Sequence, residues 1–378
     1  MKKRFNIRRL LSFVLILCIM TAITGCKKEE KEKTKEEANE FEIKVAQNIV
    51  EVYMKALMRE DIESAKKLYS KELAQKTQED GQSELKVKGY SIEETSEIGK
   101  SGFFKIKVAR MNLNNPVATL DDCSIKVAKE GAEYKINDVK NETEKEAFLE
   151  HKTIRVRSKD NIKTSLLIET SSLPQYAFPK DDAGNLSKQI VPNKGFSVMN
   201  FGYEGERIAI STYDKDSFLG IIKIDESVAT QGGGGTGGGG GESQGGGSQA
   251  GKSGGQQGGA ASMAREQPIG KEMTSLDLIK DAKIEFMTFS EGEKFILAQY
   301  NKTDKGRCIR VYNADSGELI DFKFEEKYPY GKVEIIFSSF DKDALNYEVI
   351  QKDMNDQTLQ DKVGKYQLDL KEFKAKRL

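Results

Sequence analysis

The chain has 378 residues, a length typical of about two ordinary domains, and its 60 basic side chains balance its 60 acidic ones. This balance argues against a protein that binds nucleic acid or an anionic bilayer through its charge. Trp is absent and Lys is far commoner than Arg, a composition compatible with a low-GC Gram-positive source.

The N-terminal segment has the pattern of a secretory signal. Five basic residues precede the apolar run Leu10–Met20, which is too short to span a bilayer comfortably. A basic start, a short apolar core and small residues after it are typical of a signal peptide. We therefore predict a signal peptide over residues 1–25.

The four residues Ile23-Thr24-Gly25-Cys26 end this signal and resemble the lipobox of bacterial lipoproteins. The resemblance implies cleavage between Gly25 and Cys26, diacylation of the Cys26 sulfur and acylation of the new amino group, with palmitate as the expected chain. The protein would then be lipid-anchored to the outer face of the cell membrane. A plain signal peptide, or an uncleaved anchor with a chance Cys, is the alternative.

Residues 26–40 contain the lipidated Cys26 followed by a charged segment with almost nothing apolar. Such a segment cannot offset its ordering entropy, so we predict a solvated tether. Cleavage would remove five basic and no acidic residues, leaving 55 basic against 60 acidic side chains.

An α+β domain is predicted over residues 41–145. Apolar residues recur at helical spacing from Phe41 to Leu57, and Asp61 can cap a second helix that reaches Leu73. From Leu85 onward the apolar period changes to two, through a turn at 130–133 and on to Ile136. The pattern indicates two helices packed on an antiparallel meander.

The order of these elements resembles an NTF2-like domain, in particular Val52–Leu57, Asp61–Leu73 and Tyr134–Val139. The resemblance implies a curved antiparallel sheet that wraps the helices into a cone, often with a pocket. Enzymes of this family use an acid–base group inside the cone, and no such set matches here. Asp121 and Asp122 fit a strand-entry turn, and we expect Tyr53 and Tyr69 to face the core.

An all-β domain is predicted over residues 150–378, because three stretches repeat the order strand, turn, strand, loop, strand. They are Phe196–Ile224, Ile284–Val311 with a following hairpin at Asn313–Ile320, and the weaker Val333–Val349. These units resemble the blades of TolB-like and WD40-like β-propellers. A closed propeller needs at least four blades, so we retain an incomplete propeller and a β-sandwich as alternatives.

A glycine-rich segment interrupts the repeats, with seventeen Gly in residues 232–259. We predict a disordered loop over 232–262 within the β domain. Inside it, Gly246–Ser253 matches the P-loop pattern, but no strand precedes it and no helix follows it. We therefore expect no nucleotide binding and no cofactor.

No catalytic or metal-ligating set emerges from the sequence. The single His151 lies at the domain junction, and Asp214/Asp216 and Asp341/Asp343 fit hairpin turns better than calcium loops. Cys123 and Cys308 fit buried structural thiols, with a disulfide as the alternative. We therefore predict neither a catalytic site nor a metal site.

The function predicted from the sequence is a non-catalytic binding or scaffold module, anchored in the cell envelope and presenting loops to a protein partner. Neither nucleic acid nor nucleotide is an expected partner. One alternative is a sensor or carrier holding a small apolar ligand in the NTF2-like cone. The other is an NTF2-like enzyme.

Overall fold

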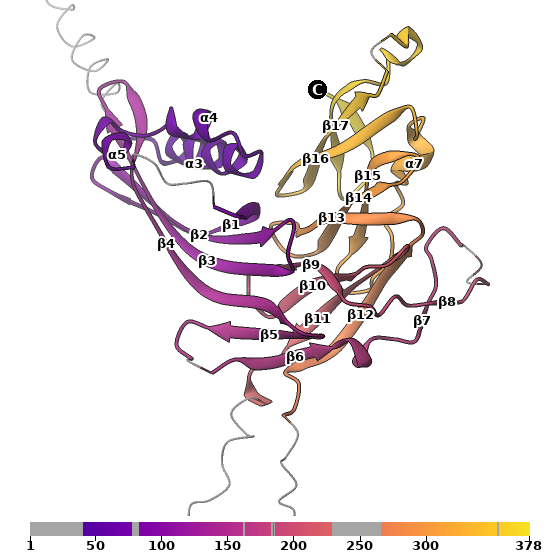
Figure 1. Ribbon diagram of the computed structural model, residues 1–378. Coiled ribbons are helices and arrows are strands. Elements are labelled where there is room, and N and C mark those ends of the chain that lie inside the picture. The colour runs from indigo at the N-terminus through magenta and orange to yellow at the C-terminus, as the bar shows by residue number, and fades with distance from the viewer. Residues whose placement is uncertain are drawn as a thin grey trace, which may run out of the picture.

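The computed structural model describes residues 41–77, 83–161, 163–182, 184, 186–228, 266–353 and 355–378. The signal peptide, Cys26, the tether and the loop 232–262 lie outside these residues, so the predictions about them stay predictions. Figure 1 shows that the described chain is mostly β structure, with a small group of helices at one edge. No helix within the described ranges is long and apolar enough to cross a membrane.

The helices follow the predicted pattern in part. They are α3 (Ile43–Met58), α4 (Ile62–Lys66) and α5 (Lys71–Lys76). Asp61 caps α4 as predicted, because its side chain accepts a hydrogen bond from the Ser64 N–H at 3.0 Å. The prediction of one continuous second helix is wrong. Tyr69 forms a β-bridge with Ile136 at that point, and Ser70 starts a new helix as its N-cap.

The predicted meander is present and forms the start of a six-stranded antiparallel sheet. Its order is β1-β2-β3-β4-β5-β6. The strands are β1 (Leu85–Ile98), β2 (Ser101–Asn112), β3 (Val117–Glu130), β4 (Glu133–Glu150), β5 (Thr153–Ser158) and β6 (Ser165–Glu169). The predicted turn between β3 and β4 contains Gly131 at φ 67°, a conformation that Gly adopts without steric cost.

The sheet does not end at the predicted domain limits. β4 runs across residue 145. The sequence pattern places β5 and β6 in the β domain, but β5 pairs with β4 and β6 pairs with β5, both in antiparallel register. The range 154–190, in which the sequence pattern offers only a weak fourth strand repeat, is therefore split between two sheets. Its first part extends the first sheet, and its second part contributes the short strands β7 (Tyr176–Ala177) and β8 (Gln189–Ile190). A 3₁₀ turn, η1 (Thr170–Ser172), connects the two parts.

The three predicted repeats each form one antiparallel sheet, in agreement with the repeat pattern. The first repeat sheet contains β9 (Phe196–Phe201), β10 (Arg207–Thr212), β11 (Ser217–Ile224) and β12 (Gly270–Ile279). The second contains β13 (Ala282–Phe289), β14 (Phe295–Lys302) and β15 (Gly306–Asn313). The third contains β16 (Val333–Asp341), β17 (Ala344–Gln351), β18 (Gly364–Asp369) and β19 (Ala375–Arg377). Two short helices, α7 (Phe324–Lys327) and η2 (Gln357–Leu359), lie in the connections.

The first sheet uses both of its faces, and this arrangement positions everything else. One face packs on α3 through side chains such as Phe104, Ile106 and Val108. The other face, through Met111 and Leu120, joins the large core of the repeats. The repeat sheets lie one after another beside the first sheet (Figure 1). The six-stranded sheet therefore contributes one face to each of the two cores, while the second half of β1 is exposed.

Candidate functional site

The residues singled out from the sequence fall into two groups. Gly25, Cys26 and the P-loop-like stretch at 246–253 lie outside the described residues, and the structure leaves these predictions untested. The turn aspartates Asp214 and Asp216 lie between β10 and β11, as predicted for a hairpin. The described part of the chain holds no group of three or more residues that could bind a metal ion.

Asp121 and Asp122 do not form a strand-entry turn, and this prediction is wrong. Both lie inside β3, and Asp121 is only 5% exposed. Its carboxylate accepts a hydrogen bond from Nε of Arg110 on β2 at 2.7 Å, and this charge pair makes the burial possible. Asp121 is thus a buried carboxylate, but its partner is an arginine and not the tyrosine that an NTF2-like acid–base pair would need.

The other predicted residues occupy structural positions. Tyr53 lies on the buried face of α3, and its hydroxyl lies 3.0 Å from that of Tyr69. His151 adopts φ 57° in the turn between β4 and β5. Cys123 and Cys308 are both buried and both free, which confirms the thiol interpretation over a disulfide. Burial raises the pKa of the Cys123 thiol to about 12, so it is protonated at neutral pH.

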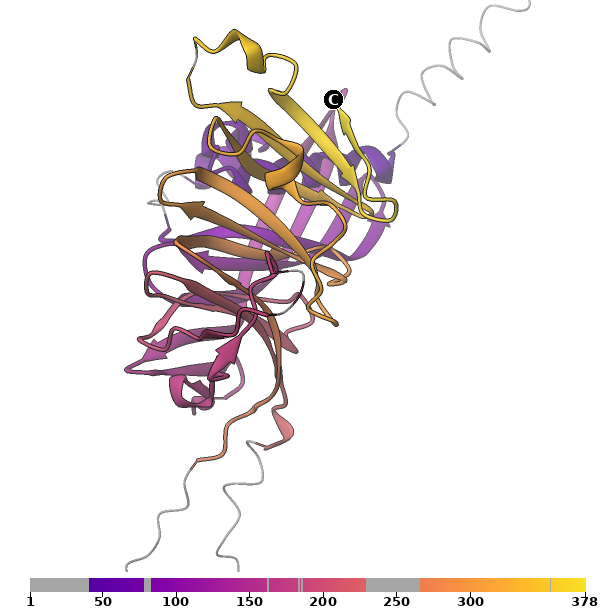
Figure 2. The same cartoon turned by 90° about the vertical axis from the view of Figure 1, so that its right-hand side faces the viewer.

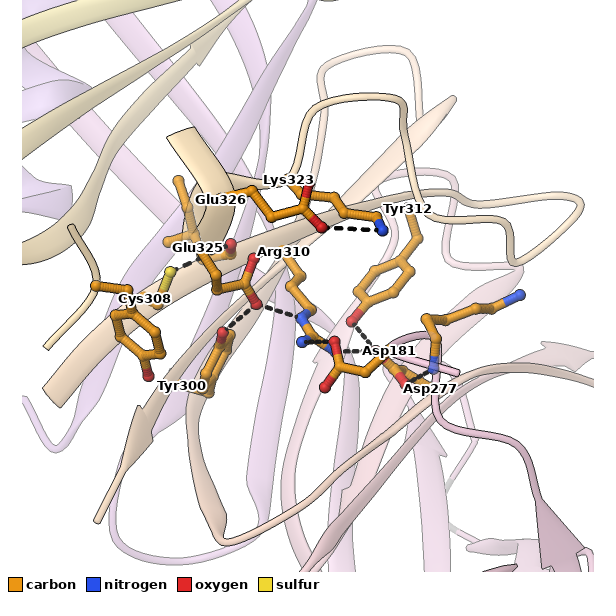
Figure 3. Close-up of polar contacts among 12 residues, drawn as sticks. Asp181, Asp277, Tyr300, Cys308, Arg310, Tyr312, Lys323, Glu325 and Glu326 are labelled. Carbon is orange, nitrogen blue, oxygen red and sulfur yellow. Dashed lines mark hydrogen bonds and ion pairs between the residues drawn. The ribbon is translucent and has the colours of Figure 1, made fainter. Parts of the chain in front are cut away.

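A buried charge network that the sequence did not lead us to predict surrounds Arg310 (Figure 3). Arg310 lies on β15, and its side chain is only 5% exposed. Its guanidinium donates from Nε to Glu325 at 2.6 Å and from Nη1 to Asp277 at 2.7 Å, and Nη2 pairs with Asp181. Three carboxylates from three separate segments therefore meet one guanidinium.

Asp277 is the most deeply buried of these carboxylates, with a fully covered side chain in β12. One oxygen accepts from the backbone N–H groups of Lys180 at 2.9 Å and Leu278 at 2.7 Å. The other accepts from Arg310 and from the Tyr312 hydroxyl at 2.8 Å. Both oxygens have two donors, so the desolvation of this carboxylate is well compensated.

Glu325 closes the opposite side of the network from α7. Its Oε1 accepts from the Tyr300 hydroxyl at 2.5 Å as well as from Arg310. Burial, together with the nearby Glu325 carboxylate, raises the pKa of Tyr300 well above its usual range. Burial alone would lower the pKa of Arg310, but the surrounding acidic groups raise it. The network therefore stays ionised as one charged arginine with neutral tyrosines.

The network fixes a hairpin to the body of the protein. Asp181 and Lys180, which contact Arg310 and Asp277, belong to the segment that connects β7 and β8. The Lys180 ammonium also pairs with Glu318 at 3.2 Å. At the base of the hairpin, the side chains Leu173, Ala177 and Val191 enter the large core. We call the described residues of the range 173–191 the anchored hairpin.

The outer side of the anchored hairpin is apolar and exposed. Tyr176 and Ile190 are direct cross-strand partners, 47% and 77% exposed, so their side chains project from the same face. Phe178 and Leu186 are also exposed. The Lys188 ammonium lies 4.1 Å from the centre of the Tyr176 ring. Figure 1 shows the hairpin projecting at one edge, and Figure 2 views the molecule from that side.

The network and the hairpin together present an ordered apolar surface. The side-chain oxygens of Asp277 and the guanidinium nitrogens of Arg310 each have a hydrogen-bond partner within the network (Figure 3). Four exposed apolar side chains on one short hairpin are unusual for a solvent-facing surface and are typical of a contact site. The outer side of the anchored hairpin is therefore an apolar, partly aromatic surface.

Comparisons with known proteins give no family for this chain. No family model matches it, and no curated protein matches it. Among solved structures, an acylaminoacyl peptidase is similar at 10% identity and a TM-score of 0.28, covering 77% of this chain and 33% of the peptidase. The tricorn protease is similar at 8% identity and a TM-score of 0.30, covering 75% and 25%. This chain therefore spans about a third or less of those two proteins.

The β-propeller domain of the Trilobed protease from Pyrococcus furiosus is similar at 10% identity and a TM-score of 0.18, covering 77% of this chain and 96% of that domain. Similarity at this level does not assign a shared fold or activity. The functional reasoning therefore rests on the residues and contacts of this chain alone.

Proposed function

We propose that this protein is an extracytoplasmic lipoprotein that acts as a non-catalytic binding or scaffold module at the cell envelope. In this proposal Cys26 carries the lipid and holds the chain on the outer face of the cell membrane. The charged segment that follows spaces the folded part from the bilayer. The anchored hairpin is the surface offered to a protein partner.

The observation that carries the proposal is the contrast between the base and the outer side of this hairpin. Its connecting segment is held by a buried charge network and its base by core side chains, whereas its outer side exposes Tyr176, Phe178, Leu186 and Ile190. Ordering an exposed hairpin costs conformational entropy, and a preorganised surface reduces the cost of binding. Aromatic and aliphatic anchors of this kind are the usual centre of a protein–protein interface.

The proposal also includes the finer folds suggested by the sequence. The helices and the first sheet are proposed to be an NTF2-like unit, and the three following sheets to be blades of an incomplete, propeller-like domain. The successive antiparallel sheets support the second assignment. The packing of α3 on a long antiparallel sheet supports the first. A propeller that presents loops to a partner suits a binding module.

We favour the binding module over a carrier of a small apolar ligand inside the cone. The space between α3 and the sheet is occupied by side chains that are 2% exposed or less, including Val50, Met54, Phe104 and Ile106. A carrier needs an enclosed apolar cavity of some hundreds of Å³. An acid–base enzyme is less favoured because Asp121 pairs with Arg110.

Site-specific photo-crosslinking in intact cells tests this function. A benzophenone amino acid would replace Ile190 on the anchored hairpin or, as a control of similar exposure, Ile98 at the turn between β1 and β2. We expect a discrete adduct from position 190 and none of the same mass from position 98. Equal patterns from both positions would contradict a partner site on the hairpin.

The anchor is tested in the same cells. We expect Cys26→Ala to release the protein into the medium and to remove the adduct if the partner is membrane-bound. Retention of Cys26→Ala at the membrane would contradict lipid attachment through this residue, while leaving the hairpin result to be judged separately.

A further inference from the structure

A second buried cation, Lys88, lies in a cleft on another part of the molecule. Lys88 belongs to β1, and its side chain is only 10% exposed. The pairing of β1 with β2 shifts register between Val87 and Gly89, so Lys88 is the extra residue of a β-bulge. Bulges re-aim a side chain and are over-represented next to functional sites.

The cleft lies between the first sheet and the second repeat sheet and has a volume of about 670 Å³. Leu113, Ile284 and Phe286 supply an apolar wall, and Lys283, Asn301 and Thr303 line it from the more exposed side. Gly89 permits the close approach of the two sheets, because a Cβ at this position would lie 2.7 Å from the Thr288 hydroxyl oxygen on β13. The volume and the mixture of apolar and polar lining are those of small-molecule sites.

Carboxylates compensate the charge around Lys88 only in part, and its ammonium also lies 5.3 Å from the centre of the Phe286 ring. Its ammonium lies 3.3 Å from Glu60, and Lys86 lies 3.3 Å from the same carboxylate, so two lysines share one acid. Glu285 also lines the cleft, but its carboxylate accepts from the Gln299 amide at 2.6 Å. Lys283 has no ion-pair partner within the described ranges. Three lysines thus face two glutamates, an excess of one positive charge.

We infer that this cleft binds a small amphiphilic monoanion, a carboxylate with an aliphatic chain, whose charged end meets Lys88 and whose chain packs on Leu113, Ile284 and Phe286. Burial lowers the pKa of Lys88, although Glu60 opposes this effect. A bound carboxylate would supply the missing counter-charge, which favours an anion over a neutral ligand of the same shape.

The test uses octanoate as the probe and octanol as its neutral match, each titrated calorimetrically into the full-length chain. We expect octanoate to bind the wild type and octanol to bind at least about tenfold more weakly, because a charge-assisted hydrogen bond is lost. Lys88→Met should weaken octanoate binding to the level of octanol, and Lys88→Arg should retain it. Lys374→Met, a control lysine outside the cleft, should bind like the wild type.

A second measurement needs no variant, so it stands even if Lys88→Met fails to fold. Octanoate should protect Lys88 from reductive methylation, measured by mass spectrometry of peptides, while leaving Lys374 unprotected. Equal binding of octanoate and octanol by the wild type would overturn the inference, as would unchanged octanoate binding in a folded Lys88→Met variant. The absence of protection at Lys88 would overturn it as well.

Discussion

Two buried cations occupy opposite situations in this protein. Arg310 meets Asp277, Glu325 and Asp181 with short, well-directed hydrogen bonds and lies inside a packed network. Lys88 has one carboxylate at 3.3 Å, which it shares with a second lysine, and it lines an open cleft. Both are cationic and nearly buried, yet their surroundings differ completely.

This difference distinguishes a buried cation that stabilises the fold from a buried cation that can bind a ligand. A guanidinium whose donors are taken by buried carboxylates has no capacity left for a ligand, and its removal leaves those carboxylates unpaired. A lysine with weak compensation beside a cavity has capacity left, and its removal relieves a desolvation cost. Arg310 therefore holds elements together, whereas Lys88 is available to a ligand.

The largest predicted effect is for Asp277→Asn, which removes one charge from the saturated network. The amide cannot accept all four hydrogen bonds, so we expect a loss of about 3 kcal/mol in the free energy of unfolding. Urea unfolding would measure it. Asp214→Asn is the matched control, because Asp214 pairs with Lys194 at an exposed position, and its loss should stay below about 1 kcal/mol. Similar losses in both variants would mean that the network has no special stability.

A smaller effect is predicted for Asp181→Ala, which cuts the link between the network and the anchored hairpin. Because Asp181 is 56% exposed, we expect a loss of about 1 kcal/mol or less in global stability. Amide hydrogen exchange should accelerate at the hairpin, including the Val191 N–H that donates to Gln175 at 3.1 Å. Asp214→Ala, at another exposed ion pair, should leave this exchange unchanged. Unaltered hairpin exchange in Asp181→Ala would show that the core side chains alone hold it.

The smallest effect concerns Asp341 on β16, which pairs with Lys55 of α3 at 2.8 Å. Burial alone would raise the pKa of Asp341, but the hydrogen bonds from Lys55, Asn346 and Gln367 bring it below the usual 3.8. A lowered folded pKa means that this stability is present above pH 4 and is lost as the pH falls through the folded pKa.

We therefore expect Asp341→Asn to lose less than about 1 kcal/mol at pH 7 and nothing measurable near pH 2. Urea unfolding at both pH values would check this. Asp343→Asn, whose exposed partner Lys371 lies at 3.0 Å, is the control. A stability difference that grows toward low pH would contradict the sign of the shift.

The sequence predicted local structure well where the hydrophobic period is clear. The cap at Asp61 and the three repeated strand units follow from spacing within a short window. The buried face of α3 was predicted only in part, because Tyr53 and Ala56 are buried as expected whereas Val45 and Val52 are exposed. The extension of the first sheet by β5 and β6 was missed, because the choice of a neighbouring strand depends on distant residues. The position of Asp121 inside β3 was missed for the same reason, since Arg110 compensates its charge from another strand.

The Arg310 network left a signal that the sequence reasoning did not use. Arg310 interrupts the apolar strand Cys308–Tyr312, and Asp277 stands between Leu276 and Leu278. A charged residue within a fully apolar strand is seldom buried unless it is paired. The identity of the partners could not be predicted, because they come from segments 33 and 129 residues away. Lys88 left no such signal, since it stands among other lysines in an ordinary alternating pattern.

The most direct test of the contrast between the two cations is a paired measurement of Arg310→Met and Lys88→Met by urea unfolding at pH 7. Removing Arg310 should lower the free energy of unfolding by about 3 to 5 kcal/mol, because buried carboxylates lose their partner. Removing Lys88 should change it by less than about 1 kcal/mol or raise it, because a poorly compensated buried charge is replaced by an apolar side chain. Equal losses, or a larger loss for Lys88→Met, would contradict the assignment of a structural role to Arg310 and a binding role to Lys88.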